Sequence, residues 1–436
     1  MSVAINTKTT STRAVLRKFP YPYRAALAIC NDADSMTAES LRFIHRYLNT
    51  DKETPLGRGL SLPVGDSFFL FSSPASPNKL TLFEGISSKL SQHADFLSEC
   101  ARSEMLDTLH TYGCFTSPDD FSRSIAERGI EALDRRGIQL QVWVNHGTSA
   151  NVQCFGLRNV KHYRGDIPGT KFYHTDITLA YGIRFCWLGE ELSDCIGEDS
   201  GHSLQHLVDR SKTMLKHLSK RQLSRARQQN KRLMRSATLR DGNQVLSFKR
   251  YAGTLGLTPV IDDLPKQLSQ SNLEKLKASQ GYSIIYQHFA VRRKGNGFGV
   301  SNYRPNSEPF FLPGEKAALE RLAEEFHNGN IFVTTTSRLL QYNLAQQGLK
   351  WNQQTSGGRL RIILDGIEEL GGVFRRVSQH EVESLTFYTS RPQETELFIK
   401  KELGEELVTG LIRNPPDETG RESVTVPPSA RAYPDL

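Results

Sequence analysis

Long apolar runs are missing from this 436-residue chain. The longest of them, such as Ala25 to Cys30, have the length of a strand, whereas a bilayer span needs roughly 18 apolar residues. The N-terminal stretch is basic and rich in Ser and Thr, but no apolar core follows it as in a secretory signal. We therefore expect a cytoplasmic protein without a transmembrane segment, whose residues 1–19 form a flexible arm.

Several catalytic and metal-binding signatures are also absent. The six cysteines show no CxxC spacing, which favours reduced thiols over a zinc knot or a disulfide framework. The sequence contains no GxSxG elbow, no P-loop and no HExxH motif. These absences exclude the commonest serine hydrolases, nucleotide-binding proteins and zinc proteases.

Positive charge is concentrated in one segment. The formal net charge is +8, but residues 210–240 alone contain eleven Lys and Arg and no acidic residue. The apolar spacing before this stretch predicts a basic helical segment over residues 204–240. A solvated helix is one interpretation, and a surface arm that contacts a polyanion or a membrane surface is the other.

Short β-branched or aromatic runs alternate with helical patterns over residues 20–345. Helical examples are 37–47, 122–136 and 315–326. The strand-like runs are Ala25 to Cys30, Ser67 to Ser72, Thr108 to Thr111, Leu140 to Asn145, Ile183 to Leu188, Val245 to Lys249, Ser283 to Phe289 and Asn330 to Thr335. Their number and spacing predict an α/β fold, a β/α barrel of seven or eight parallel strands.

The pattern changes near the C-terminus. Short alternating runs with little helix between them begin at Arg359, and proline becomes frequent after Arg413. Residues 346–436 are therefore predicted to form a β-rich accessory domain with a Pro-rich tail. In a β/α barrel the active site lies at the C-terminal ends of the strands, so polar residues at those ends are the candidates for function.

Strand ends supply a set of metal-binding side chains. Asp32 and Asp34 follow the first strand, His110 ends the third and His146 ends the fourth. One carboxylate and two imidazoles form a facial ligand set suited to zinc or another first-row divalent ion. Such an ion lowers the pKa of its water toward about 7 while a nearby carboxylate takes the proton, a combination that hydrolyses amides or esters.

Other polar residues near the strand ends are candidates for catalysis or substrate binding. His288 is either a general acid or oxyanion donor, or a core histidine. Asp66 either faces the barrel mouth or forms a turn, and the turn is favoured. The predicted substrate-binding residues are Asn145, Asn151, His174, Asp176 and Arg250, although a hydrogen bond between His174 and Asp176 that holds a loop is equally open.

The motifs Asn31-Asp32-Ala-Asp34, His110-Thr-Tyr-Gly113 and Val142-Trp-Val-Asn145-His146-Gly147, followed by Asn151, resemble in order and content the glycoside hydrolase/deacetylase barrel superfamily. The nearest likeness is to divergent polysaccharide deacetylase-like proteins of bacterial glycan gene clusters, over residues 20–345. That resemblance implies a catalytic base at Asp32 and a metal ligand at Asp34, although Ala33 between them leaves the reverse assignment open.

The family takes two metal histidines from a His-x-x-x-His motif on the third strand, but here Cys114 stands four residues after His110. His146 would then supply the second imidazole. The implied reaction removes an N-acetyl group from a sugar, with Asp32 accepting the proton of the attacking water and His288 protonating the departing amine.

Three functions are compatible with these residues. The first is a metal-dependent carbohydrate deacetylase. The second is a metal-independent glycoside hydrolase that pairs Asp32 or Asp34 with Asp176 or Asp66. The third is a non-catalytic barrel protein that binds a glycan in its mouth and a polyanion through residues 210–240.

Overall fold

The computed structural model describes residues 13–74, 80–189, 191–199, 232–254, 257–293, 311–369 and 372–436. It divides into two compact units. The larger contains Ala25–Leu340 and Arg431–Leu436, and the smaller contains Met1–Arg24 and Gln341–Ala430. The predicted boundary is at residue 345, whereas the two units divide between Leu340 and Gln341 and the last six residues belong to the larger unit.

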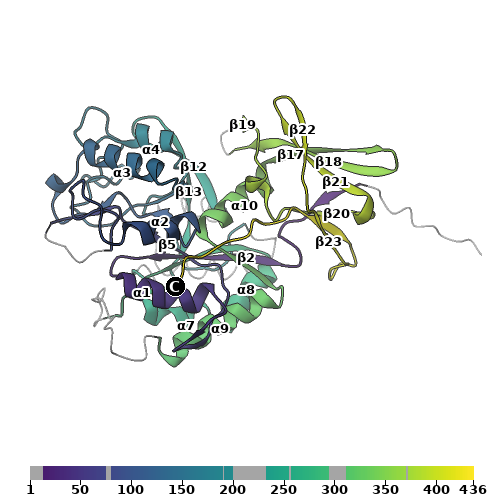
Figure 1. Ribbon diagram of the computed structural model, residues 1–436, viewed down its shortest axis with the longest axis horizontal. Coiled ribbons are helices and arrows are strands. Elements are labelled where there is room, and N and C mark those ends of the chain that lie inside the picture. Colours follow the sequence, from purple (N-terminus) through teal and green to yellow (C-terminus); the bar gives the residue numbers. More distant parts are fainter. Residues whose placement is uncertain are drawn as a thin grey trace, which may run out of the picture. The chain divides into compact units, whose positions relative to one another are not determined.

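The larger unit is built around a curled, mostly parallel sheet (Figure 1). Its strand order is β11-β14-β15-β2-β5-β7-β9-β10-β13-β12, with β16 paired to β2. Among the described strands of this sheet, only β12 and β13 pair in antiparallel fashion. The strands are β2 (Ala25–Asp32), β5 (Gly65–Phe68), β7 (Leu106–Leu109), β9 (Val142–Val144), β10 (Phe185–Trp187), β11 (Leu192–Ser193), β12 (Met234–Thr238), β13 (Gln244–Phe248), β14 (Arg250–Tyr251), β15 (Tyr282–Gln287) and β16 (Ile331–Thr334). Each predicted run overlaps a parallel strand, so the parallel α/β sheet is confirmed.

Helices separate most of these strands, as the apolar spacing predicts. They are α1 (Ala38–Asn49), α2 (Ala94–Arg102), α3 (Arg123–Arg135), α4 (Thr175–Tyr181), α7 (Leu264–Gln267), α8 (Gln270–Ser279), α9 (Pro313–His327) and α10 (Thr336–Gly348), with 3-10 turns at Pro118–Asp120 and Ile261–Asp263. Helix α1 begins where the Thr37 hydroxyl caps the backbone N–H of Ser40, and Leu41, Ile44 and Leu48 form its buried face.

The central strand β2 is buried along its whole length. Leu27 and Ile29 belong to the apolar core shared with the surrounding helices. Because side chains alternate across a strand, Ala28, Cys30 and Asp32 point to the opposite, inner face of the curled sheet. This alternation places the Asp32 carboxylate inside the curl, at the C-terminal end of the strand.

Short strands pair outside this sheet: β3 (Glu53–Thr54) with β4 (Gly57–Arg58), and β6 (Phe71–Ser72) with β8 (Gly113–Cys114). The predicted basic helical segment lies mostly outside the described residues. Its described end, residues 232–240, includes strand β12, so the helical prediction is wrong there. Residues 234–238 pair with β13 because its edge offers unpaired backbone groups.

The smaller unit is rich in β structure, as predicted. One sheet has the order β1-β20-β24-β23, and a second has β17-β18-β21-β22 with β19 beside β18. The strands are β1 (Val15–Leu16), β17 (Leu349–Ser356), β18 (Arg359–Glu368), β19 (Phe374–Arg375), β20 (Thr386–Tyr388), β21 (Thr395–Lys401), β22 (Gly404–Leu407), β23 (Ile412–Asn414) and β24 (Ser423–Thr425), with 3-10 turns at His380–Val382 and Pro392–Glu394. Where the structure describes this unit, all strand pairings are antiparallel except that of β18 with β21.

Residues 13–19 are part of this smaller unit, so the flexible arm predicted for 1–19 is wrong for its described part. Strand β1 pairs with β20. The buried guanidinium of Arg17 donates hydrogen bonds to the carbonyl oxygens of Phe19, Pro20 and Tyr23 at 2.9, 2.7 and 2.7 Å. A side chain that satisfies three backbone acceptors fixes this segment in place.

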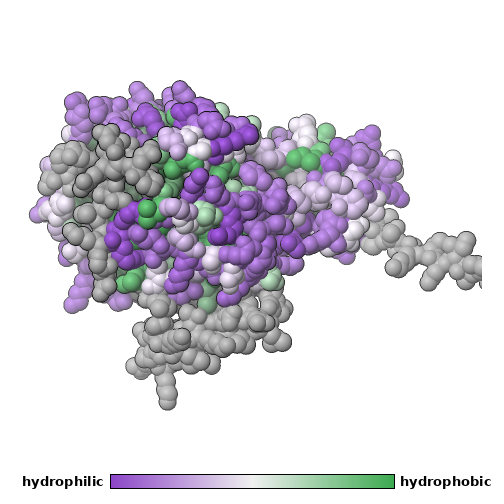
Figure 2. Space-filling model, turned by 90° about the horizontal axis from the view of Figure 1, so that it is seen from below, coloured by the Kyte–Doolittle hydropathy of each residue, from purple (hydrophilic) through white to green (hydrophobic). Residues whose placement is uncertain are grey.

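Among the described helices, none combines the length and the apolar character needed to cross a membrane. The face drawn in Figure 2 is largely hydrophilic, with apolar side chains in small separate areas.

Candidate metal centre

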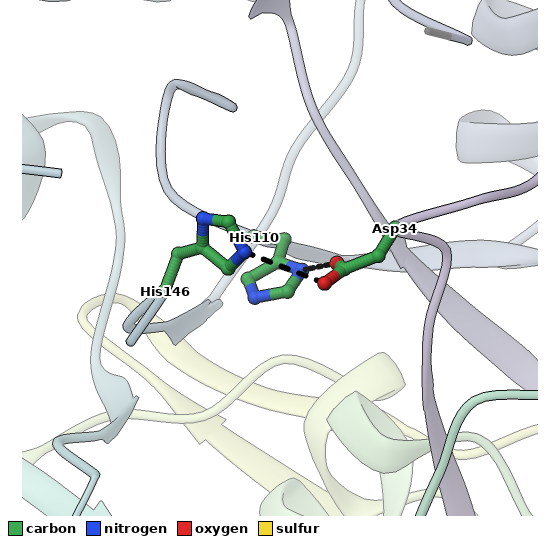
Figure 3. A group of neighbouring side chains, drawn as sticks. All are labelled: Asp34, His110 and His146. Atoms are coloured by element: carbon green, nitrogen blue, oxygen red, sulfur yellow. Dashed lines mark ion pairs between the residues drawn. The ribbon is translucent and has the colours of Figure 1, made fainter. Parts of the chain in front are cut away.

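Three parallel strands of the same sheet deliver the candidate metal-binding side chains to one edge of the sheet. Asp34 lies two residues beyond the end of β2, His110 directly follows β7, and His146 lies two residues beyond β9. In the sheet, β5 lies between β2 and β7, and β9 follows β7. Since the strands are parallel, their C-terminal ends meet at the same edge and the three side chains converge there (Figure 3).

The three side chains are close enough to share one ion. Their ligand atoms all lie within 4.8 Å of one another. His110 Nδ1 is 3.1 Å from Asp34 Oδ1, and His146 Nε2 is 3.3 Å from Asp34 Oδ2 (Figure 3). A carboxylate and two imidazoles are ligands that zinc and other first-row divalent ions accept, and this number leaves coordination positions open. The structure thus brings together the ligand set predicted from the sequence.

The electrostatic environment keeps the Asp34 carboxylate ionised. Burial alone would raise its pKa, but the neighbouring His110 and His146 imidazoles outweigh burial and hold the pKa well below its usual range. The side chains of Asp34 and His146 remain 14% and 13% exposed, whereas that of His110 is 2% exposed. Among the described residues, the Asp34–His146 side is therefore the more open side of the triad.

A phenylalanine fixes both histidine rings. The Phe69 ring stacks on His110 at a centroid distance of 4.7 Å and an interplanar angle of 16°. Its edge meets His146 at 5.5 Å. Phe69 is buried, so it excludes water from one side of the triad and restricts ring rotation. No pattern in the sequence indicated this role, because Phe69 lies in an apolar run that is typical of any core strand.

The second carboxylate, Asp32, is held by a buried arginine. Arg250 Nη1 donates to the two Asp32 oxygens at 3.0 and 2.9 Å, and Ser67 Oγ donates to Oδ1 at 3.1 Å. Burial raises the pKa of Asp32, but the Arg250 charge, followed by His110 and His288, lowers it overall. Asp32 is therefore an ionised, oriented carboxylate 3.9 Å from His110 Nε2.

Arg250 itself is fully buried. Its guanidinium lies between the rings of Trp187 and Tyr286, at 3.7 and 3.5 Å from their centroids. These cation–π contacts and the Asp32 ion pair compensate for the loss of hydration. The prediction that Arg250 binds substrate is not supported, because the side chain is inaccessible and already engaged by Asp32.

His288, which directly follows strand β15, faces both carboxylates. Its Nδ1 donates to the Pro259 carbonyl at 2.7 Å, so the other nitrogen, Nε2, points toward Asp32 and Asp34 at 4.0 and 3.9 Å. Burial lowers the pKa of His288 and outweighs the two carboxylates, which raise it. A proton taken up at Nε2 would thus be readily released, as a general acid requires.

The other predicted substrate-binding residues serve the scaffold. Asn145 is buried, and its amide donates to the carbonyl oxygens of Phe155 and Leu188 at 2.7 and 3.0 Å. Asn151 is also buried and contacts His146 Nδ1 at 2.7 Å. Both side chains hold the loop after β9 rather than face solvent, so neither is placed to contact a substrate.

His174 and Asp176 lie in different surroundings and do not form the loop-holding pair left open by the sequence. His174 is fully buried against the Gln153 carbonyl at 2.7 Å, and burial lowers its pKa to about 4. Asp176 lies at the surface, where it binds the Arg123 guanidinium at 2.8 and 2.9 Å. The structure therefore does not support either residue as a substrate contact.

Asp66 does not form a turn and does not face the triad. Its carboxylate is buried behind the sheet and accepts from His45 Nε2 of α1 at 2.9 Å. Burial lowers the pKa of His45, but Asp66 and Asn49 raise it overall. Because Asp66 and Asp176 both have partners outside the site, neither supplies the second carboxylate of the glycoside hydrolase alternative.

The chain matches no protein-family model and no curated protein.

Proposed function

We propose that this chain is a metal-dependent amide hydrolase that removes an N-acetyl group from a sugar of a polysaccharide or its precursor. The observation that carries the proposal is the convergence of Asp34, His110 and His146 beside a second, ionised carboxylate, Asp32. The resemblance of the strand-end motifs to polysaccharide deacetylases supplies the substrate class.

The pairing of the strands also supports a closed β/α barrel as the frame of this site. Strand β13 pairs with β10, and β14, which begins only two residues after β13 ends, pairs with β15. We therefore infer a ring that runs from β2 through β5, β7, β9, β10, β13–β14 and β15 back to β2.

The donor set fits a divalent ion, with zinc the first candidate. A bound ion would act as a Lewis acid that lowers the pKa of water and polarises the substrate carbonyl. Asp34, His110 and His146 would hold that ion. Asp32, oriented by Arg250 and kept ionised, would accept the proton of the attacking water.

His288 would then complete the reaction. A new C–O bond forms as water adds to the acetyl carbon, and the C–N bond breaks. The proton that Asp32 accepts from the water would pass to His288 Nε2, 4.0 Å from Asp32 Oδ2, and from there to the departing nitrogen, so the products are acetate and the free amino sugar. The Pro259 carbonyl fixes the ring so that Nε2 is the atom that moves this proton.

The test begins with the metal content of protein purified without chelator. We expect near-stoichiometric zinc or another divalent ion in the wild type and its loss in His110→Ala/His146→Ala. The matched control, His93→Ala/His327→Ala, removes two histidines from the ends of α2 and α9 and should retain the ion. If the wild type takes up no zinc, cobalt or nickel, the deacetylase is excluded and a non-catalytic glycan-binding protein is favoured.

A second variant separates metal binding from catalysis. Asp32→Asn should keep the ion but lower acetate release from N-acetylated oligosaccharides by about 10²- to 10⁴-fold, because it removes the proton acceptor. Unchanged acetate release would show that Asp32 is not the base.

A further inference from the structure

The amide of Asn151 lies directly behind the metal ligand His146. Its Nδ2 is 2.7 Å from His146 Nδ1, the ring nitrogen that faces away from Asp34. The amide also contacts the Thr148 hydroxyl through Nδ2. Which end of the amide faces the histidine decides which ring nitrogen carries the proton, since an amide nitrogen can only donate and an amide oxygen can only accept.

Two backbone N–H groups fix that orientation. The Tyr112 N–H donates to Gln153 Oε1 at 2.9 Å, so the other end of the Gln153 amide is the NH₂ group. This group donates to Asn151 Oδ1 at 3.1 Å. The Phe115 N–H donates to the same oxygen at 3.3 Å. Backbone N–H groups cannot exchange donor for acceptor, so Asn151 Oδ1 must face them and Nδ2 must face His146.

We propose that Asn151 is a positioning residue that holds His146, before any metal binds, in the tautomer with its proton on Nε2. Because Asn151 donates to Nδ1, that nitrogen carries the lone pair and Nε2 carries the hydrogen. Nε2 is the nitrogen that lies 3.3 Å from Asp34 Oδ2. In this tautomer its hydrogen points toward Asp34, at the position where a bound ion would need the lone pair of Nε2. The inference rests on the metal site proposed above and concerns how that site is regulated.

This arrangement is the reverse of the usual one. A metal-binding histidine normally donates its other N–H to a carboxylate or a carbonyl, which fixes the tautomer that can bind. Here an ion can use Nε2 only if the proton moves to Nδ1 and the Asn151 amide turns. The turn would set the Asn151 NH₂ group against the N–H groups of Gln153 and Phe115. The Asn151 amide therefore opposes metal binding.

A single substitution should reverse this effect. Asn151→Asp keeps the shape of the side chain, and its two oxygens can accept from Phe115, Gln153, Thr148 and a His146 Nδ1–H. We expect the dissociation constant for zinc to fall by 10-fold or more, the scale on which such outer partners act. The matched control Thr148→Val removes the other neighbour of Nδ2 and should change zinc affinity less than twofold.

The direct test is the tautomer of His146 in the metal-free wild type. In protein with ¹⁵N-labelled histidine rings, two-bond ¹H–¹⁵N spectra should show His146, assigned by the loss of its signals in His146→Gln, with a protonated Nε2 and a bare Nδ1. In Asn151→Asp the proton should move to Nδ1. A wild-type His146 protonated at Nδ1, or at both nitrogens, overturns the proposal, as does equal or weaker zinc binding by a folded Asn151→Asp.

The two proposals fail in different ways. If the wild type bound no metal but its spectrum showed the Nε2–H tautomer, the deacetylase proposal would lose its metal while the role of Asn151 would stand. If the wild type bound zinc tightly in the Nδ1–H tautomer, the metal site would stand and the role of Asn151 would be refuted.

Discussion

Replacing Arg250 by methionine should destabilise the protein by about 3–5 kcal/mol, because it leaves the buried Asp32 carboxylate without its cation. Both oxygens of Asp32 lie within 3.0 Å of Arg250 Nη1, and both side chains are almost fully buried. Methionine keeps most of the apolar contact with Trp187 and Tyr286, so the loss of stability reports the removal of the positive charge. Urea unfolding at pH 7, monitored by circular dichroism, measures the free energy of unfolding.

The surface pair of Arg123 and Asp176 provides the matched control. It has similar distances, 2.8 and 2.9 Å, but its side chains are 34% and 42% exposed. Arg123→Met should therefore lower the free energy of unfolding by about 1 kcal/mol or less. Equal losses of unfolding free energy in Arg250→Met and Arg123→Met would show that burial does not decide the strength of the Asp32–Arg250 pair.

A double-mutant cycle and a pH series test the same pair. The double variant Asp32→Asn/Arg250→Met should be more stable than the sum of the single variants predicts, because no buried charge remains unpaired. In the wild type the pKa of Asp32 is lowered, so its contribution to stability is present above the unfolded pKa and is lost as pH falls. Without Arg250 the carboxylate is buried unpaired, so acidification should relieve part of the destabilisation in Arg250→Met.

Two further predictions concern other residues of the larger unit. Phe69→Leu should weaken zinc binding several-fold, because the aromatic ring that stacks on His110 is lost; a zinc titration measures this. The control Phe83→Leu disrupts a different stacked pair and should leave zinc affinity unchanged. Burial raises the pKa of Asp107 to about 6, so the carboxylate disfavours folding as pH rises from 4 to 7. Over that range the free energy of unfolding of Asp107→Asn, measured with urea, should rise by about 3 kcal/mol relative to that of the wild type. A difference between the two proteins that does not change with pH would contradict this prediction.

The sequence was sufficient to predict the parallel sheet and the convergence of Asp34, His110 and His146. Its strands are short, apolar and separated by helical patterns, and the parallel arrangement brings their C-terminal ends to one edge. Asp34, His110 and His146 could therefore be predicted to meet, although they are up to 112 residues apart in the chain. The convergence depends on the order of the strands in the sheet, and the order of the same strands along the sequence already suggested it.

The partners of these residues could not be predicted in the same way. Asn151 and Arg250 were expected to bind substrate, but they instead hold His146 and Asp32. An asparagine or arginine near a strand end has the same appearance in a sequence whether its side chain is exposed or buried. The rings of Trp187 and Tyr286 pack against the Arg250 guanidinium and help to remove it from solvent.

Asp32 and Asp66 show why the sequence predicts the edge of the sheet at which a side chain lies better than the face to which it points. Strands β2 and β5 pair Asn31 with Asp66 and Asp32 with Ser67. Ser67 and Asp32 therefore share the inner face, where the Ser67 hydroxyl donates to the carboxylate, whereas Asp66 points outward to His45. A shift of one residue in this register would exchange the two faces. Polar residues after apolar runs thus identify the edge of the sheet where the candidate site lies. The face on which each side chain lies depends on the register between strands, which the whole sheet determines.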